Sequence, residues 1–314
     1  MATPSLPRIT AALVIGLANL VHPPSRSEPI RPKSAEARAI TPPSSYIGWP
    51  TLVRRRTGEL WVVASGGREA HVCPFGQVIA ITSSDEGRSW TLRSEDGGLS
   101  WQPATRCPVN SPHGPIQLRD GRLLYPGKEL WSDSKLIGVW ESRDDGKTWI
   151  HLANIPARAG DDTAKGYHEL HGVEASNGEL IVHIRNHNQP NANETLQSES
   201  SDGGRTWSVP HPLKVIDGTV GVWGLPSHLL RLQDGRLLMT YGHRRAPLGN
   251  QARTSADHGA SWSEPIVISD DATSGDLGYP STAELADRSF LTVWYEKTKG
   301  SPNAVLRQCR WTLP

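Results

Sequence analysis

Five short segments of the chain combine aromatic, histidine and acidic side chains, and they recur at intervals along it. They read GWP (48–50), SPHGP (111–115), YHELHG (167–172), WGLPSH (223–228) and GYPS (278–281). A tyrosine next to a carboxylate can act as a nucleophile, and a histidine can carry a proton near neutral pH. If the fold brings these segments to one place, the site is suited to breaking a bond in a polar substrate.

A second set of side chains lies in the loops that follow the hairpins begun by these segments. It contains cations and further proton carriers: Arg68, Glu69, His71, Arg185, His187, His243 and Arg244. An arginine presents a planar fork of N–H groups that matches a carboxylate. The two sets together favour a sugar that carries a carboxylate as the substrate.

The elements that must position these residues are marked by an eight-residue repeat, Ser-x-Asp-x-Gly-x-Ser/Thr-Trp. Its five copies are Ser83–Trp90, Ser94–Trp101, Ser142–Trp149, Ser200–Trp207 and Ser255–Trp262. The Asp and Gly are typical of a tight turn, and the Trp supplies a large apolar anchor. We expect these turns to support the fold and to carry no chemistry.

Except for the copy at 94–101, each of these turns follows a predicted hairpin and a third strand. The hairpins span residues 51–65, 115–127, 172–185, 228–242 and 282–296. Four antiparallel strands in about 40–50 residues are typical of a propeller blade, so the prediction is an all-β propeller. Trp90 and Trp101 are too close to enclose a whole blade, which predicts a truncated blade near residues 91–111. Either five blades close the ring, or this fragment and residues 35–48 complete a sixth.

The composition narrows the class of protein further. Among 314 residues there are 33 basic and 32 acidic side chains, which argues against a nucleic-acid partner. The apolar run from Ile9 to Val21 is too short for a membrane span and predicts a signal peptide over residues 1–24. Residues 25–44 read as a linker and 45–314 as the propeller domain of a secreted or periplasmic protein. No Cys/His spacing indicates a metal site, and no cofactor is expected.

The repeat resembles the Asp-box of the sialidase (neuraminidase) superfamily, from about Tyr46 to Leu313. The resemblance implies a six-bladed propeller with an axial site, in which a tyrosine nucleophile is activated by a glutamate and three arginines hold the carboxylate of the sugar. The segment GYPSTAEL places Tyr279 at the nucleophile. The segment HELHGVEASNGELIVHIRN places Glu169 at its base and Arg185 at one arginine.

The sequence departs from the family pattern at three positions. Gly48-Trp49-Pro50 stands where the first arginine is expected, and the loop at 66–76 lacks the acid/base aspartate. No arginine falls in register with the third one of the family, although Arg244, Arg245 and Arg253 lie nearby. His71 or Glu69 would then transfer the proton, and Arg244 would assist Arg185. The remaining predicted substrate-binding residues are Arg68, His113, His168 and Trp49.

Three functions remain open from the sequence. The first is a sialidase-like exo-glycosidase that removes a terminal acidic sugar, with sialic acid as the family default. The second is a lyase or unusual glycosidase that uses His and Tyr on a uronate polysaccharide. The third is a propeller that binds carbohydrate without catalysis.

Overall fold

A computed structural model describes residues 29–33, 35–73, 76–92, 107–129, 131–224 and 226–314. The predicted signal peptide, residues 1–24, lies outside the described residues. So does the repeat copy at 94–101, together with most of the segment for which a truncated blade is predicted.

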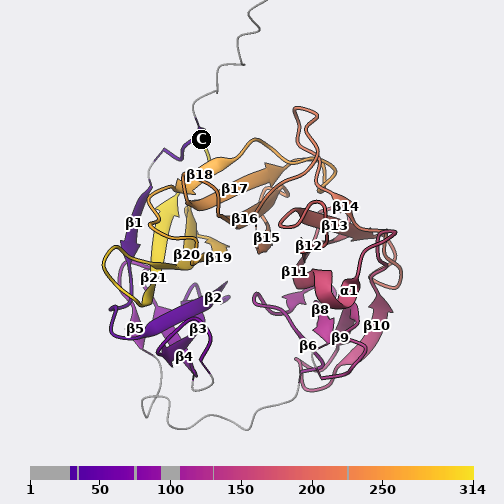
Figure 1. The fold of residues 1–314 in the computed structure, drawn as a ribbon, viewed down its shortest axis with the longest axis horizontal. Helices are drawn as coiled ribbons and strands as arrows, with labels where there is room; N and C mark the ends of the chain where they lie inside the picture. Colours follow the sequence, from indigo (N-terminus) through magenta and orange to yellow (C-terminus); the bar gives the residue numbers. More distant parts are fainter. Residues whose placement is uncertain (1–28, 34, 74–75, 93–106, 130, 225) are drawn as a thin grey trace, which may run out of the picture.

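The described residues form five antiparallel sheets arranged around a common axis, a five-bladed propeller arrangement (Figure 1). The first two sheets contain β2 (Tyr46–Arg54), β3 (Leu60–Arg68), β4 (Gln77–Ser83) and β5 (Thr91–Leu92), and then β6 (Val109–Asn110), β7 (Ile116–Gln117), β8 (Leu123–Glu129), β9 (Ile137–Ser142) and β10 (Ile150–Asn154). The prediction of an all-β propeller is therefore confirmed, and each predicted hairpin belongs to one sheet.

The other three sheets repeat the same order of strands. They contain β11 (Tyr167–Glu174), β12 (Leu180–Asn186), β13 (Thr195–Ser200) and β14 (His211–Pro212); β15 (Ser227–Arg231), β16 (Leu237–His243), β17 (Gly249–Ser255) and β18 (Ile266–Ser269); and β19 (Leu277–Glu284), β20 (Phe290–Lys297) and β21 (Ala304–Trp311) with β1 (Glu36–Ala39). The innermost strands β2, β11, β15 and β19 begin at segments singled out in the sequence. In the second sheet, residues 111–115 interrupt the inner edge between β6 and β7.

The outer strand of the last sheet comes from the beginning of the described chain. β1 pairs antiparallel with β21, with Glu36 opposite Arg310 and Ala39 opposite Arg307. Strand β1 lies inside the range 25–44, which the sequence predicts to be a linker. The sequence does not reveal the strand there because a short polar strand on a sheet edge leaves little apolar pattern. Its pairing partner also shows that residues 36–39 complete the fifth sheet and do not contribute to a sixth.

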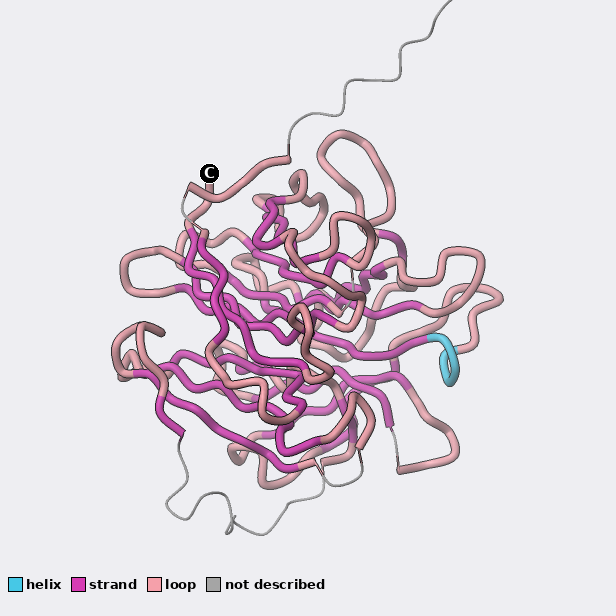
Figure 2. Tube along the Cα trace, turned by 60° about the vertical axis from the view of Figure 1, so that its left-hand side comes forward, coloured by secondary structure: helices cyan, strands magenta, loops and turns pink. Residues whose placement is uncertain are grey.

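The sheets pack face to face through apolar side chains that alternate along the strands. Between the third and fourth sheets, for example, Val173 and Ile181 pack with Leu229, Met239 and the fully buried Trp262. Only one short helix occurs in the described chain, α1 (Thr163–Gly166), shown in cyan at the edge of Figure 2. No helix in the described ranges has the length and apolar character needed to cross a bilayer.

The four described repeat turns share one hydrogen-bond pattern. In the last copy, Ser255 Oγ donates to Asp257 Oδ1 and accepts from the Gly259 N–H, both at 2.8 Å. Asp257 also accepts from the backbone N–H of Ser261 at 2.9 Å. Gly259 has a φ of +92°, a conformation that favours glycine. The side chains of the motif are therefore used within the turn, as the sequence predicts.

Replacing Ser255 by Ala is expected to lower the free energy of unfolding by about 1–3 kcal/mol, because the buried Gly259 N–H loses its acceptor. Chemical denaturation measures this loss. The more exposed Ser261→Ala variant should lose less stability. A Ser255→Ala protein that keeps the full stability of the parent would contradict this structural role.

Candidate active site

Three side chains reach the axis from the same structural position in three different sheets. Trp49, Glu169 and Tyr279 have φ values of +54°, +47° and +52°, although none is a glycine. Each lies at a register shift near the start of an inner strand, between β2 and β3, β11 and β12, or β19 and β20. Left-handed backbone at a bulky residue costs roughly 1–3 kcal/mol and is concentrated at functional sites. The backbone of the fold is thus strained at the three positions from which these side chains point toward the axis.

Tyr279, Glu169 and Arg185 form one hydrogen-bonded cluster. The Tyr279 hydroxyl donates to Glu169 Oε1. Arg185 Nη1 donates to Glu169 Oε2 at 2.6 Å and to the Tyr279 hydroxyl oxygen at 3.3 Å. The structure therefore brings together, from β19, β11 and β12, the three residues that the family resemblance singles out.

The surroundings of this cluster set its protonation. Burial raises the pKa of Tyr279 well above its usual value, and the negative charge of Glu169 raises it further. Burial acts to lower the pKa of Arg185, but the charge and hydrogen bond of Glu169 outweigh this effect and raise it. Tyr279 is consequently a neutral phenol at ordinary pH, and it needs a base at the moment it attacks. Glu169 Oε1 is in place to accept that proton.

The cluster forms one wall of a hollow of about 540 Å³ at the axis. The residues that line it are Trp49, His71, Asn110, Ser111, Pro112, Lys128, His168, Glu169, Arg185 and Tyr279. Seven site residues besides the cluster itself are predicted from the sequence. Three of them, Trp49, His71 and His168, also line this hollow. The rings of Trp49 and His71 meet edge to face, with their centroids 5.3 Å apart.

Lys128 is a pocket residue that the sequence reasoning missed. Its ammonium donates to the carbonyl oxygens of Ala164 and Tyr167, the latter at 3.1 Å, and lies 3.4 Å from His168 Nδ1. Burial lowers its pKa. Lys128 lies near the end of the second strand of its hairpin, as Arg68 and Arg185 do in theirs, and this shared position is the signal that could have identified it.

Other predicted site residues lie outside the lining of this hollow. Arg68 is 2% exposed, and its guanidinium stacks on Trp49 with Cζ 3.8 Å from the ring centroid. Glu69 is exposed at the surface. Arg244 donates through Nη2 to the Leu277 carbonyl at 2.8 Å and lines a smaller hollow. Of the two residues predicted as proton donors, His71 is therefore the one in the pocket.

His113 belongs to a buried cluster of three histidines next to the site. Its ring centroid lies 6.5 Å from that of Tyr279, 5.3 Å from that of His171 and 5.2 Å from that of His228. His171 Nδ1 accepts a hydrogen bond from the Leu229 N–H, which leaves its other nitrogen protonated. In the described part of the chain no three His, Cys, Asp or Glu side chains are arranged to hold a metal ion.

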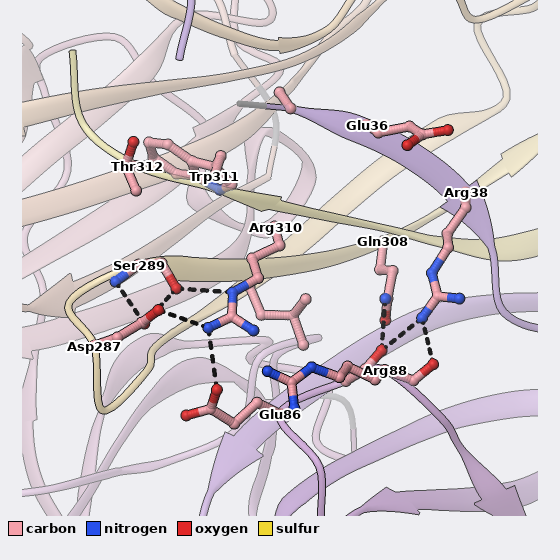
Figure 3. Close-up of a pocket in the computed structure, with 13 residues that line it drawn as sticks. Glu36, Arg38, Glu86, Arg88, Asp287, Ser289, Gln308, Arg310, Trp311 and Thr312 are labelled. Carbon is pink, nitrogen blue, oxygen red and sulfur yellow. Dashed lines mark hydrogen bonds and ion pairs between the residues drawn. The ribbon is translucent and has the colours of Figure 1, made fainter. Parts of the chain in front are cut away.

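A second hollow, of about 510 Å³, lies between the first and last sheets (Figure 3). Three of its charged groups are paired: Arg310 Nη2 lies 2.7 Å from Asp287 and 3.0 Å from Glu86. Arg38 and Gln308 donate to the Gly87 carbonyl at 2.7 and 2.8 Å. These contacts join the turn after β4 to β21, so this hollow is a seam between two sheets.

Comparisons with known proteins agree with this fold. The sequence model of the BNR repeat-like domain matches residues 32–292. An exo-alpha-sialidase of Aspergillus fumigatus is 26% identical over 196 residues, which are 51% of this chain and 44% of that relative. The chain thus spans less than half the length of this curated relative.

Two solved structures extend the comparison. A protein of unknown function from Dyadobacter fermentans has a TM-score of 0.73 at 20% identity, covering 91% of this chain and 100% of that one. The Trypanosoma rangeli sialidase in complex with the inhibitor DANA has a TM-score of 0.54 at 15% identity, covering 85% of this chain and 55% of that one. At these identities the two structures show the fold alone. The match to the BNR repeat-like domain, together with the similarity to the exo-alpha-sialidase, confirms the resemblance to the sialidase superfamily.

Proposed function

The chain belongs to the BNR repeat-like domain family, and from this premise we propose that it is a retaining exo-glycosidase that removes a terminal acidic sugar, of which sialic acid is the first candidate. The observation that carries the proposal is the hydrogen-bonded cluster of Tyr279, Glu169 and Arg185 in an axial pocket. Sialidases are the glycosidases in which a tyrosine replaces the usual carboxylate nucleophile.

In the first step, the Tyr279 hydroxyl oxygen attacks the anomeric carbon while Glu169 Oε1 takes the phenolic proton. The bond from that carbon to the leaving oxygen breaks, and protonated His71 gives its Nε2 proton to the leaving oxygen. A neutral tyrosine suits this step because a carboxylate nucleophile would repel an acidic sugar.

In the second step, His71 accepts a proton from water, and the water oxygen attacks the anomeric carbon. The bond to Tyr279 breaks, and the tyrosine recovers its proton from Glu169. Two displacements at one carbon leave its configuration unchanged, so the product retains the anomeric configuration of the substrate.

The charge of the pocket supports an acidic substrate. Arg185 uses Nη1 for Glu169 and Tyr279, while its Nη2 has no hydrogen bond to the described residues. Lys128 has no ion pair with any carboxylate in the described ranges, so its charge is not cancelled locally. Among the described residues, Glu169 is the one carboxylate that lines the pocket, against the two cations Lys128 and Arg185, and this balance attracts an anion.

We expect Lys128→Gln to raise KM for an acidic aryl glycoside by about 10-fold, because about 1.4 kcal/mol of attraction is lost. KM for the matching neutral glycoside, in which an amide replaces the carboxylate, should not change. Lys165→Gln is the control, since the Lys165 side chain is 88% exposed and follows Ala164, whose carbonyl accepts a hydrogen bond from Lys128. An equal rise in KM for the acidic and the neutral glycoside would contradict the role of charge.

A panel of aryl and disaccharide glycosides, acidic and neutral, tests the proposed function. Hydrolysis of an acidic member with retention, followed by proton NMR, is the expected result. A product with a new carbon–carbon double bond, absorbing in the ultraviolet, would show a uronate lyase instead. Binding of an acidic glycan without any product would show a carbohydrate-binding propeller.

Secretion is part of the proposal and depends on the signal peptide predicted over residues 1–24. An acidic sugar at the end of an extracellular glycan would be accessible to a secreted enzyme. N-terminal sequencing of protein exported by the native host would reveal a chain that begins near residue 25 if the prediction is right.

A further inference from the structure

The loop that carries His71 is held in place by a buried cation. Arg68 Nη1 donates to the His71 carbonyl oxygen at 2.5 Å. The guanidinium of Arg68 lies between two rings, 3.8 Å from the centroid of Trp49 and 4.8 Å from that of Tyr46. Burial without a carboxylate partner lowers the pKa of Arg68. The hydrogen bond from Arg68 thus fixes the backbone of His71, whose side chain lines the pocket.

The ring of His71 is held by a carboxylate from the opposite end of the sequence. His71 Nδ1 lies 3.1 Å from Asp276 Oδ1 and 2.8 Å from the Tyr46 hydroxyl oxygen. The hydroxyls of Tyr46 and Tyr295 donate to the same Asp276 oxygen, at 2.8 and 3.2 Å. Lys297 lies 3.3 Å from the other oxygen.

These contacts determine which nitrogen of His71 carries a proton. Burial would raise the pKa of Asp276, but the hydrogen bond from Tyr46 and the charges of His71 and Lys297 lower it, so Asp276 is ionised at neutral pH. An ionised carboxylate accepts only, and the single Tyr46 hydroxyl proton is already donated to it. The short contact between Tyr46 and His71 therefore requires a proton on His71 Nδ1. Nε2 is the nitrogen left for the pocket.

We propose that Asp276 is the positioning residue of this site, and that it orients His71 through Nδ1 so that Nε2 exchanges the proton with the leaving oxygen. Tyr46 supports the same orientation. Asp276 transfers no proton itself. The inference rests on the proposed function for its chemistry. In the sialidase superfamily an aspartate in the loop at 66–76 is expected to transfer the proton, and this chain has none there. The inference assigns that proton transfer to His71, oriented by Asp276.

The first test needs no substrate. In protein labelled with 15N-histidine, the His71 signal is identified among the 12 histidines by its loss in His71→Gln. We expect neutral His71 to carry its proton on Nδ1 in the parent protein, and to shift toward the Nε2-protonated form in Asp276→Asn. Asp271→Asn is the matched control, because Asp271 lies in the same loop and pairs with Arg307 at 3.0 Å. An unchanged His71 tautomer in Asp276→Asn would overturn the proposal.

The second test separates positioning from a general loss of structure. A 4-nitrophenol leaving group needs little help from an acid, whereas a sugar leaving group needs a proton. Asp276→Asn should lower kcat/KM on the order of 10²-fold for the sugar leaving group and by less than about threefold for 4-nitrophenol. Equal losses on both substrates would contradict the inference.

The two proposals fail in different ways. Absence of turnover by the parent protein on every acidic glycoside would contradict the proposed function, while the tautomer measurement would still decide the role of Asp276. If Asp276→Asn does not fold, Tyr46→Phe gives the same test, because it removes the acceptor 2.8 Å from Nδ1. That variant should move the tautomer and the leaving-group dependence in the same direction, by a smaller amount.

Discussion

Replacing Tyr279 by Phe is expected to lower kcat on an acidic aryl glycoside by a factor on the order of 10³ or more, because the variant has no oxygen to attack the anomeric carbon. The fold should survive the change. Glu169 keeps its pair with Arg185 at 2.6 Å, so no buried charge loses its partner. Initial rates and thermal unfolding of the purified variant measure the two quantities separately.

The control for this variant is Tyr241→Phe. Tyr241 is 1% exposed, and its hydroxyl donates to Gln251 at 2.9 Å, away from the pocket. It should cost stability and leave kcat unchanged. If Tyr279→Phe retained more than a tenth of the parent activity, Tyr279 would not be the nucleophile, and the binding or lyase functions would have to be reconsidered.

Acid is expected to destabilise the protein strongly below about pH 6.5, because several histidines are buried in neutral form. Burial lowers the pKa of His183 and His228 to about 4, and lowers that of His113 and His171 well below the usual value. As the pH falls below 6.5, the unfolded chain binds protons that the folded chain does not. At about 1.4 kcal/mol for each pKa unit, His183 and His228 would each remove on the order of 3 kcal/mol by about pH 4.

Two variants test this origin of acid sensitivity, with chemical denaturation at a series of pH values as the measurement. His228→Leu should make the loss of stability with acid less steep. His211→Gln should make it steeper, because the hydrogen bond that His211 donates to Glu199 raises the pKa of His211 and stabilises the fold on the acid side. Identical pH dependence in both variants and the parent would show that other groups control acid unfolding.

The architecture could be predicted from the sequence because its determinants are local. The Ser-x-Asp-x-Gly-x-Ser/Thr-Trp turns satisfy their own hydrogen bonds, as Ser255, Asp257 and Gly259 illustrate. Their spacing gives the length of a blade. The same periodicity points to the starts of the inner strands, where Glu169 and Tyr279 meet. What repeats along the chain could be recognised without knowing which sheets become neighbours.

The remainder of the site depends on contacts between distant parts of the chain. Asp276 has no motif of its own, and its importance comes from lying beside His71 and Tyr46 across the seam between the last and first sheets. Arg68 was expected to bind substrate, but the ring of Trp49 covers it. Burial of a cation under an aromatic ring is set by the packing of neighbouring strands, which no local pattern encodes.

The central claim is that Tyr279 forms a covalent bond to the sugar. A fluorinated acidic glycosyl fluoride slows the second displacement, so the intermediate accumulates and can be located by peptide mass spectrometry. One adduct per chain, on the peptide containing Tyr279 and absent from Tyr279→Phe, is the predicted result. An adduct on Glu169, or turnover with inversion and no adduct, would contradict the account.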